Sequence, residues 1–368
     1  MIIGIDGNEA NVEHKVGVSV YASKLLQYFQ KQADKDIQFR IYLRKKPNPD
    51  LPSETPYFKY RIVFGPTLWL RLFLPLYLNI RRESDVFFAP AHYSPSSLPL
   101  PLVVTIHDLA YYYYPDEFLK KDLFKLRNWT KESVEKAKKI IAVSKTTKKD
   151  IMKFYEISDN KIDVIYNGFE KNSSSNVKEV WETLANRYSL QQSKYILYLG
   201  TLQPRKDIPT LIAAFNQFHN THQDMKLVIV GKKGWMYDEI IKGMSENQEN
   251  IIFTGYIPDA EASALYQHAF CFVLPSLYEG FGIPILEAMS YGCPVITSYA
   301  ASLPEVGGEA CLYFEPKSSQ DLLFNLNLLF NDKKLQKELK NKGFERITEF
   351  SWEKCAEETL TQLKAMVK

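Results

Sequence analysis

Two glutamates stand eight residues apart in the sequence, between an apolar run and a helical pattern. They open and close the stretch Glu-Gly-Phe-Gly-Ile-Pro-Ile-Leu-Glu, from Glu279 to Glu287. Glu279 falls in the loop ahead of the predicted helix, and Glu287 falls about one turn inside it. Carboxylates placed in this way can accept hydrogen bonds from hydroxyl groups on both sides of a bound anion. A capped core helix with one satisfied glutamate is the alternative interpretation.

The helix N-terminus between these glutamates is predicted to form a phosphate site. Pro284 suits the first turn of a helix, because the N–H that proline lacks would be unpaired there anyway. The N–H groups of Ile283, Ile285 and Leu286 are predicted to be free and to face a ligand with the positive end of the helix dipole. The glycines of the loop would let the backbone approach that ligand closely. The candidate binding residues of this segment are Gly280, Phe281, Gly282 and Ile283.

Two adjacent cations occupy a second loop between a strand and a helix. Arg205 and Lys206 follow the strand that ends at Gly200, and Asp207 is predicted to cap the next helix. Adjacent cations at the carboxyl end of a strand can neutralise a diphosphate and stabilise it as a leaving group. Together with the two glutamates, this loop predicts a site for a nucleotide-diphosphate sugar. Without the glutamates, two exposed surface cations would be the better interpretation.

The first half of the chain contributes two further loops. Gly17 permits a close turn before a helical pattern that Ser19 can cap, and this N-terminus would point at the same phosphate. His107 follows the predicted strand Val103–Ile106, where it can hydrogen-bond a sugar hydroxyl or a leaving group, or can be purely structural. The tyrosines at Tyr111–Tyr114 can stack on sugar faces or fill a core, and the sequence does not separate these two roles.

Several common motifs are absent. The sequence contains no G-x-G-x-x-G, G-x-x-x-x-G-K-[ST], G-x-S-x-G or H-E-x-x-H, which are typical of dehydrogenases, P-loop NTPases, α/β-hydrolases and zinc proteases. The D-x-D at Asp34–Asp36 is predicted to be a solvated turn, and His219 and His222 are predicted at the surface. No metal site is therefore predicted. The cysteines have no zinc spacing and are interpreted as small core residues: Cys271, Cys293, Cys311 and Cys355.

The length of 368 residues predicts two domains. Apolar residues make up 45% of the chain and charged residues 24%, which is typical of soluble globular proteins. The net charge of +3 is too small to indicate nucleic acid as a partner. Its distribution is uneven, because residues 1–170 hold 26 Lys and Arg against 20 Asp and Glu, whereas residues 171–368 hold 20 against 23.

One segment raises the question of a membrane. Leu68–Leu78 is apolar, but it contains Arg71 and Pro75 and is far shorter than the ~20 residues that a spanning helix needs. It is either a buried helix that leads into a strand or a helix lying in a membrane interface, supported by Arg81 and Arg82. The N-terminal residues run directly into a strand pattern without a signal peptide, so we expect a cytoplasmic protein, with peripheral contact to the inner membrane face as an added option.

Short apolar runs alternate with amphipathic helical patterns along the chain, which predicts an α/β fold with doubly wound parallel sheets. We predict domains over residues 1–175 and 190–345 and a final helix over 346–368, with a linker-like run at Asn172–Asn176. The predicted strands are Ile2–Asp6, Phe39–Leu43, Val86–Ala89, Val103–Ile106, Lys139–Val143, Lys161–Ile165, Tyr195–Leu199, Lys226–Val230, Ile251–Thr254, Phe270–Leu274 and Val295–Thr297.

These motifs, in this order, resemble the retaining glycosyltransferases of family 4, which have the GT-B fold of two Rossmann-like domains. The most specific part is the E-x7-E motif from Glu279 to Glu287, and the Pro-Arg-Lys-Asp loop and Ser302–Gly307 are also similar to family sequence. The resemblance covers almost the whole chain. Many relatives have Arg directly after the glycine at position 200, whereas this chain has Thr201, so the cationic role falls to Arg205 and Lys206.

The resemblance implies a role for each candidate residue. The C-terminal domain would bind the donor, with Glu279 on the sugar hydroxyls and Glu287 on the ribose, and Gly200 belongs to the same site. Arg205 and Lys206 would hold the diphosphate. The remaining implied contacts are the loop at Gly17 on the diphosphate, His107 near the reacting centre, and Tyr256 with Ile257 on the nucleobase.

The resemblance also implies partners and a reaction. The N-terminal domain would bind a glycan or lipid-linked acceptor, and the final helix would return to that domain. A sugar would be transferred with retention, without a metal or other cofactor, in a manner similar to the mannosyltransferases of bacterial polysaccharide synthesis. The alternatives are a sugar-nucleotide epimerase, a phosphorylase on the same fold, and a non-catalytic subunit that binds sugar nucleotides.

Overall fold

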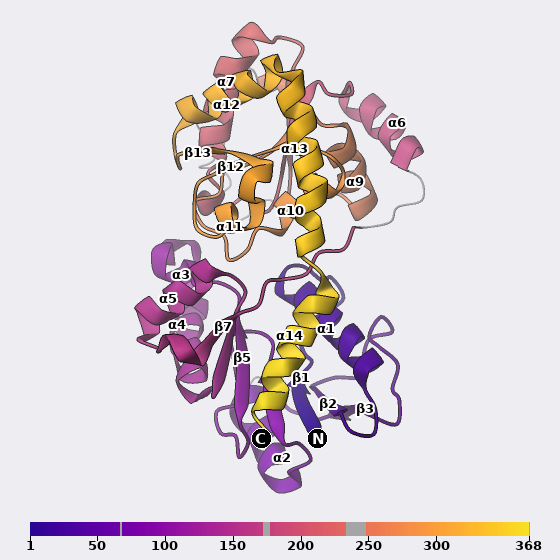
Figure 1. Cartoon of the computed structure of the whole chain (residues 1–368), viewed down its shortest axis with the longest axis vertical. Coiled ribbons are helices and arrows are strands. Elements are labelled where there is room, and N and C mark those ends of the chain that lie inside the picture. Colours follow the sequence, from indigo (N-terminus) through magenta and orange to yellow (C-terminus); the bar gives the residue numbers. More distant parts are fainter. Residues whose placement is uncertain (67, 172–176, 233–247, 368) are drawn as a thin grey trace. The chain divides into compact units, whose positions relative to one another are not determined.

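The computed structural model describes residues 1–66, 68–171, 177–232 and 248–367. Its contacts divide the chain into two units (Figure 1). Unit 1 comprises Met1–Gly168 together with Phe350–Lys368, and unit 2 comprises Phe169–Glu349. The chain therefore leaves unit 1 after Gly168 and returns to it at Phe350. The predicted linker Asn172–Asn176 and the last residue of the predicted final helix, Lys368, lie outside the described residues.

Unit 1 is built on a parallel sheet that, among the described residues, has seven strands in the order β3-β2-β1-β4-β5-β6-β7. The order of the strands reverses between β1 and β4, and ligands of open parallel sheets bind at the carboxyl edge of such a reversal. The strands are β1 (Ile2–Asp6), β2 (Gln38–Leu43), β3 (Phe58–Ile62), β4 (Val86–Ala89), β5 (Leu102–Ile106), β6 (Lys139–Ala142) and β7 (Ile162–Val164).

Helices cover both faces of this sheet, because alternate side chains of each strand point to opposite faces. Val86 and Phe88 of β4 join a core with α1 and α14, whereas Phe87 and Ala89 join a second core with α2, α4 and α5. The helices are α1 (Val18–Gln32), α2 (Leu74–Arg81), α3 (Ala110–Tyr113), α4 (Lys120–Lys136), α5 (Lys145–Tyr155) and α14 (Trp352–Ala365), with a π-helical turn η1 (Trp69–Phe73) and 3₁₀ turns η2 (Pro115–Glu117) and η3 (Asp159–Lys161).

Unit 2 has a six-stranded parallel sheet within the part of the chain that is described, in the order β10-β9-β8-β11-β12-β13. Its reversal of strand order lies between β8 and β11. The strands are β8 (Tyr195–Leu199), β9 (Lys226–Val230), β10 (Ile251–Gly255), β11 (Cys271–Leu274), β12 (Val295–Ser298) and β13 (Cys311–Phe314). The helices are α6 (Val177–Tyr188), α7 (Ile208–Thr221), α9 (Asp259–His268), α10 (Ile283–Ser290), α11 (Leu303–Gly307), α12 (Ser319–Asn331) and α13 (Lys333–Arg346), with 3₁₀ turns η4 (Pro204–Lys206), η5 (Gln248–Asn250), η6 (Gly308–Ala310) and η7 (Ile347–Glu349).

The structure confirms the doubly wound α/β class and each of the eleven predicted strands. The sequence patterns missed β3 and β13, which lie at sheet edges. β3 mixes apolar with charged residues, unlike the continuous apolar runs of central strands, whereas β13 is a run of only four apolar residues whose two middle side chains are half-buried. Among the described residues, none of the helices has both the length and the apolar character needed to cross a bilayer.

The structure also tests several single residues. The D-x-D is a turn as predicted, since the Asp34 carboxylate accepts the N–H groups of Asp36 and Ile37 at 2.8 and 2.7 Å. The four cysteines are buried and free, as expected of core residues. His219, predicted at the surface, is buried instead, and its Nδ1 lies 2.9 Å from the carbonyl oxygen of Met225. His222 is half-buried, with its ring stacked on Phe218.

Candidate active site

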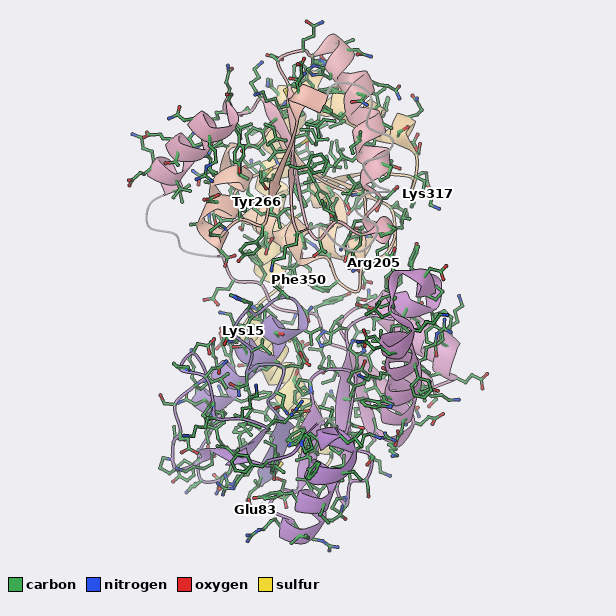
Figure 2. All side chains as sticks on the ribbon, turned by 180° about the vertical axis from the view of Figure 1, so that it is seen from behind. Lys15, Glu83, Arg205, Tyr266, Lys317 and Phe350 are labelled. Carbon is green, nitrogen blue, oxygen red and sulfur yellow. The ribbon has the colours of Figure 1, made fainter. Side chains whose placement is uncertain are left out.

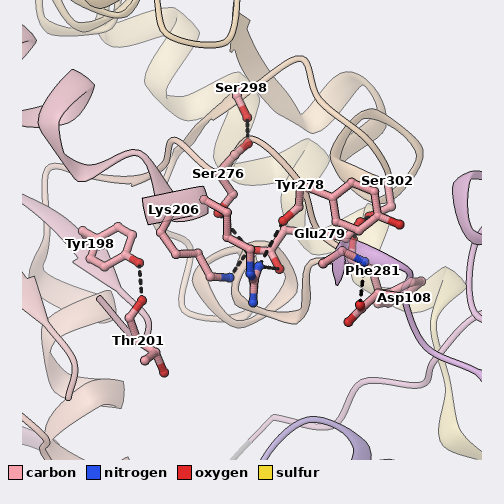
Figure 3. A network of polar contacts seen from close by, with 12 residues as sticks. Asp108, Tyr198, Thr201, Lys206, Ser276, Tyr278, Glu279, Phe281, Ser298 and Ser302 are labelled. Carbon is pink, nitrogen blue, oxygen red and sulfur yellow. Dashed lines mark hydrogen bonds and ion pairs between the residues drawn. The ribbon is translucent and has the colours of Figure 1, made fainter. Parts of the chain in front are cut away.

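Two loops of unit 2 bring Arg205, Lys206 and Glu279 together at the reversal of strand order (Figure 3). The first loop follows β8 and the second follows β11, and these strands are neighbours in the sheet. The Lys206 ammonium donates to the Glu279 carboxylate, and the Arg205 guanidinium lies 3.6 Å from its other oxygen. Each of these three side chains is less than a fifth exposed. The two loops are also joined by their backbones, since Leu277 N–H donates to Arg205 C=O at 2.8 Å.

Three buried serines hold the loop that carries Glu279 (Figure 3). Ser302 Oγ donates to the carbonyl groups of Glu279 and Phe281, at 2.8 Å in both cases. Ser276 Oγ donates to the Glu279 carboxylate at 2.7 Å, and Ser298 Oγ donates to the Ser276 carbonyl. Sequence reasoning missed Ser276 and Ser298, although Ser276 lies only three residues before Glu279. The loop is thus positioned by hydrogen bonds to its own backbone.

The charges of this cluster decide the protonation state of Glu279. Burial raises the pKa of the Glu279 carboxyl, but the Lys206 and Arg205 cations and the hydrogen bonds from Lys206 and Ser276 outweigh it, so the pKa is lowered from its usual value. Glu279 is therefore a carboxylate at neutral pH. Arg205 or Lys206 can therefore bind a second anion only by dividing its contacts between that anion and Glu279, or by releasing Glu279.

A depressed pKa predicts a pH dependence of stability. The carboxylate of Glu279 contributes stability above its unfolded-state pKa, and this contribution is lost as the pH falls through the lower, folded-state value. Between about pH 5 and about pH 3, we expect the melting temperature of Glu279→Gln to fall less than that of the wild type. Thermal unfolding followed by circular dichroism would measure this. Parallel curves for the two proteins would contradict the assignment.

The N-terminus of α10 differs in one respect from its prediction. Gly282 is the N-cap with φ 115°, in the left-handed region, and a Cβ there would lie 3.0 Å from Leu303, so glycine is required. Pro284 occupies the first turn as predicted. The N–H of Ile285 is not free, however, because it donates to Gly282 C=O at 3.1 Å in a tight first turn.

Glu287 lies on α10 and is held by a tyrosine rather than by the cations. The Tyr266 hydroxyl of α9 donates to Glu287 Oε2 at 3.1 Å. Burial raises the pKa of Glu287, and the hydrogen bond from Tyr266 offsets this only in part. Figure 2 labels Tyr266 and Arg205 on the ribbon of unit 2. The described contacts thus link Glu279 to Arg205 and Lys206, and they link Glu287 to a different helix.

The remaining candidate residues of unit 2 follow β8 and β10, which lie on either side of β9 in the sheet. Gly200 follows β8, and its N–H donates to Val230 C=O at 2.9 Å. Tyr256 follows β10 and is 64% exposed, with the Lys232 ammonium 4.8 Å from its ring centre, whereas Ile257 is buried. An exposed aromatic ring beside a cation is suited to stacking on a nucleobase. Asp207, predicted to cap α7, sits at the N-cap but makes no capping hydrogen bond.

Gly17 and His107 belong to unit 1. Gly17, rather than Ser19, is the N-cap of α1, and a Cβ there would meet nothing within 4 Å. His107 is buried at the end of β5, and its Nε2 lies 2.8 Å from the carbonyl oxygen of Pro90. Tyr111 and Tyr112 pack into the core of unit 1, so the structure favours the core interpretation for these two tyrosines.

Two protein families match the chain in succession. The family described as Glycosyltransferase Family 4 matches residues 16–172, and the family described as Glycosyl transferases group 1 matches residues 182–346. In sequence, the chain is 30% identical to O-antigen chain mannosyltransferase B of Escherichia coli over 286 residues, which cover 76% of this chain and 74% of that protein.

Solved structures show the same fold. Sucrose-phosphate synthase of Thermosynechococcus elongatus superposes with a TM-score of 0.76 at 18% identity, covering 99% of this chain and 98% of that one. HepE of Anabaena, solved in complex with UDP and glucose, superposes with a TM-score of 0.71 at 18% identity over 99% of both chains. The two parallel sheets and these neighbours confirm the GT-B fold. Taken with the sequence matches, they show that this chain is a glycosyltransferase and belongs to family 4.

Proposed function

We propose that this enzyme transfers a sugar with retention from a nucleotide-diphosphate sugar to a hydroxyl of a glycan or lipid-linked acceptor. The observation that carries the proposal is the cluster of Arg205, Lys206 and Glu279 at the reversal of strand order in unit 2. The name of the Escherichia coli relative supports mannose as the donor sugar and a cell-surface polysaccharide as the product. The nucleotide bound to the Anabaena protein supports a nucleotide donor.

The proposed chemistry uses the two cations as stabilisers of the leaving group. The bond between the donor's anomeric carbon and the diphosphate oxygen breaks, and its electron pair stays on the diphosphate. The acceptor oxygen forms its bond to the same carbon on the same face, and the acceptor proton passes to the departing phosphate. Arg205 and Lys206 would stabilise the developing negative charge, so the proposal assigns that role to no metal ion or cofactor. Glu279, freed from the cations, would accept hydrogen bonds from the sugar hydroxyls.

A two-stage experiment tests this function. Thermal unfolding with UDP, GDP and their glucose and mannose derivatives would identify the donor, because a ligand that binds the folded state raises the melting temperature. Transfer to a mannose-containing acceptor would then be followed, and the anomeric configuration of the product would be read by NMR. An α-linked product from an α-linked donor is expected. Epimerised donor, phosphate-dependent release of sugar, or binding without any transfer would each contradict the proposal in favour of an alternative.

We extend the proposal to peripheral contact with an anionic membrane through η1 and α2. This segment buries Trp69 and Leu78 in unit 1. Its opposite side leaves large apolar side chains more than 45% exposed at intervals of four residues, with two exposed arginines at the C-terminal end of α2. Apolar side chains beside cations are typical of helices that lie in a membrane interface. The exposed residues are Leu68, Leu72, Leu76, Ile80, Arg81 and Arg82.

Polar substitution of this surface is expected to weaken membrane binding. The triple variant Leu72→Ser, Leu76→Ser, Ile80→Ser removes apolar area that would otherwise leave water, so we expect at least about a tenfold loss of partitioning to vesicles of phosphatidylglycerol and phosphatidylethanolamine. Cosedimentation with the vesicles measures this. Phe324→Ser removes a side chain that is 67% exposed on α12 of unit 2 and serves as the matched control. Equal partitioning of the wild type and the triple variant would refute membrane contact at this surface.

A further inference from the structure

The loop after β4 carries a histidine that the candidate site does not include. His92 follows β4 by three residues, at the carboxyl edge of unit 1 where the strand order reverses between β1 and β4. Its N–H donates to Thr105 C=O of β5 at 2.9 Å. His92 is thereby held beside the end of the strand that leads to His107, at the edge where open parallel sheets bind ligands.

The backbone of His92 is strained. Its φ of 47° lies in the left-handed region, which costs a residue with a side chain about 1–2 kcal/mol. Strain of this kind persists where the surrounding structure enforces it, and it is concentrated at functional sites. The imposed conformation sets the His92 ring 5.6 Å from that of His107, centre to centre, with an angle of 47° between the planes.

The hydrogen-bonding capacity of the two imidazoles differs. His107 Nε2 is 2.8 Å from Pro90 C=O, and because a carbonyl only accepts, this nitrogen carries the proton. His92 is half-buried, and its Nδ1 is buried without a hydrogen-bond partner among the described residues. A buried nitrogen without a partner is costly unless a ligand supplies one.

Both imidazoles are neutral near neutral pH. Burial, followed by the neighbouring His92, lowers the pKa of His107 to about 3. Burial also lowers the pKa of His92, against the opposing effect of the Asp108 carboxylate. A neutral imidazole offers one donor and one acceptor, which are the complements of the acceptor and donor of a sugar hydroxyl.

We propose that His92 binds the acceptor, by a hydrogen bond between its imidazole and a hydroxyl of the acceptor sugar. This inference rests on the proposed function and names a residue of unit 1 that recognises the acceptor rather than the donor. In this proposal, the strained loop after β4 places the imidazole of His92 at the sheet edge. The ligand class is a hydroxyl-rich glycan end.

Substitution of His92 by glycine removes both the imidazole and the backbone strain, so a loss of acceptor binding cannot be a consequence of added strain. His92→Gly relaxes the left-handed backbone, so we expect a melting temperature within a few degrees of the wild type. With saturating donor, we expect the KM for the acceptor to rise at least tenfold while the Kd for the nucleoside diphosphate changes less than twofold. Glu156→Gly, at an exposed left-handed residue with φ 56° after α5, is the matched control for relief of strain. It should leave both constants unchanged.

A second variant guards against a fold defect. His92→Asn can place an amide near the position of Nδ1, and we expect its acceptor KM to fall between those of the wild type and the glycine variant. Acceptor KM values within twofold of the wild type for folded variants would overturn the role of His92 and leave the glycosyl transfer reaction standing. Donor binding by the wild type without transfer to any glycan would overturn the proposed function, and the role of His92 with it.

Discussion

Replacing Arg205 and Lys206 together by alanine is expected to reduce kcat/KM by about a thousandfold or more. Removal of a single preorganised charge-stabilising group costs about 10²- to 10³-fold in rate, and these two cations lie within one buried cluster. The loss should fall mainly on kcat, because charge on the diphosphate grows as the bond to the sugar breaks. Steady-state transfer with the donor found by thermal unfolding measures it.

Two controls define this result. Arg187→Ala with Lys194→Ala removes the same charge from exposed ion pairs of unit 2 and should change kcat/KM less than twofold. Adding Glu279→Gln to the double variant of Arg205 and Lys206 should restore stability, because it removes a buried carboxylate that has lost its cations. Activity should stay low in that triple variant. Transfer at the wild-type rate by the double variant would remove the cations from the mechanism.

Gly168→Ala is expected to lower the free energy of unfolding of unit 1 by about 3 kcal/mol. A Cβ on Gly168 would lie 2.2 Å from the backbone nitrogen of Trp352 and 2.4 Å from its Cα. These are backbone atoms at the start of α14, so relief of the clash requires the whole helix to move. The Trp352 ring also packs edge-on against Tyr21 of α1, 6.2 Å between centres. Thermal unfolding and limited proteolysis within α14 would report the change.

Gly7→Ala provides the comparison for that prediction. Its Cβ would meet side-chain methyl groups of Ile41 and Leu43 rather than the backbone of a helix, so we expect a smaller loss of about 1–2 kcal/mol. Equal melting temperatures for the two alanine variants would show that α14 is not held at Gly168 as described.

More of the fold than of the candidate site could be predicted from the sequence. Strands buried on both faces read as continuous apolar runs and were found, whereas edge strand β3, with Lys59 and Arg61 between its apolar residues, was not. Glu279 of the E-x7-E motif and the adjacent cations were predicted in two separate loops, and the structure brings these two loops together. Their union in one cluster depends on β8 and β11 being neighbours, although 73 positions separate Lys206 from Glu279.

Other features of the site depend on dihedral angles and partners that residue types do not encode. Ser19 and Asp207 were both predicted as caps, but Gly17 begins α1 and the Asp207 side chain makes no capping bond. The partners of Glu279 include Ser276, which is an ordinary loop residue by type. The left-handed backbone of His92 also could not be predicted from the residues around it in the sequence. The roles of the candidate residues in donor binding stay predictions until the variants are measured.

The return of the chain to unit 1 at Phe350 has a consequence for synthesis on the ribosome. Residues 350–367, which include all of α14, are synthesised only after every residue of unit 2. Until then, nascent unit 1 lacks the helix that covers α1. Unit 2 is one continuous segment of the chain, so it can fold while unit 1 is still incomplete. A chaperone that shields nascent apolar surface would therefore be needed longest by the half of the protein that is translated first.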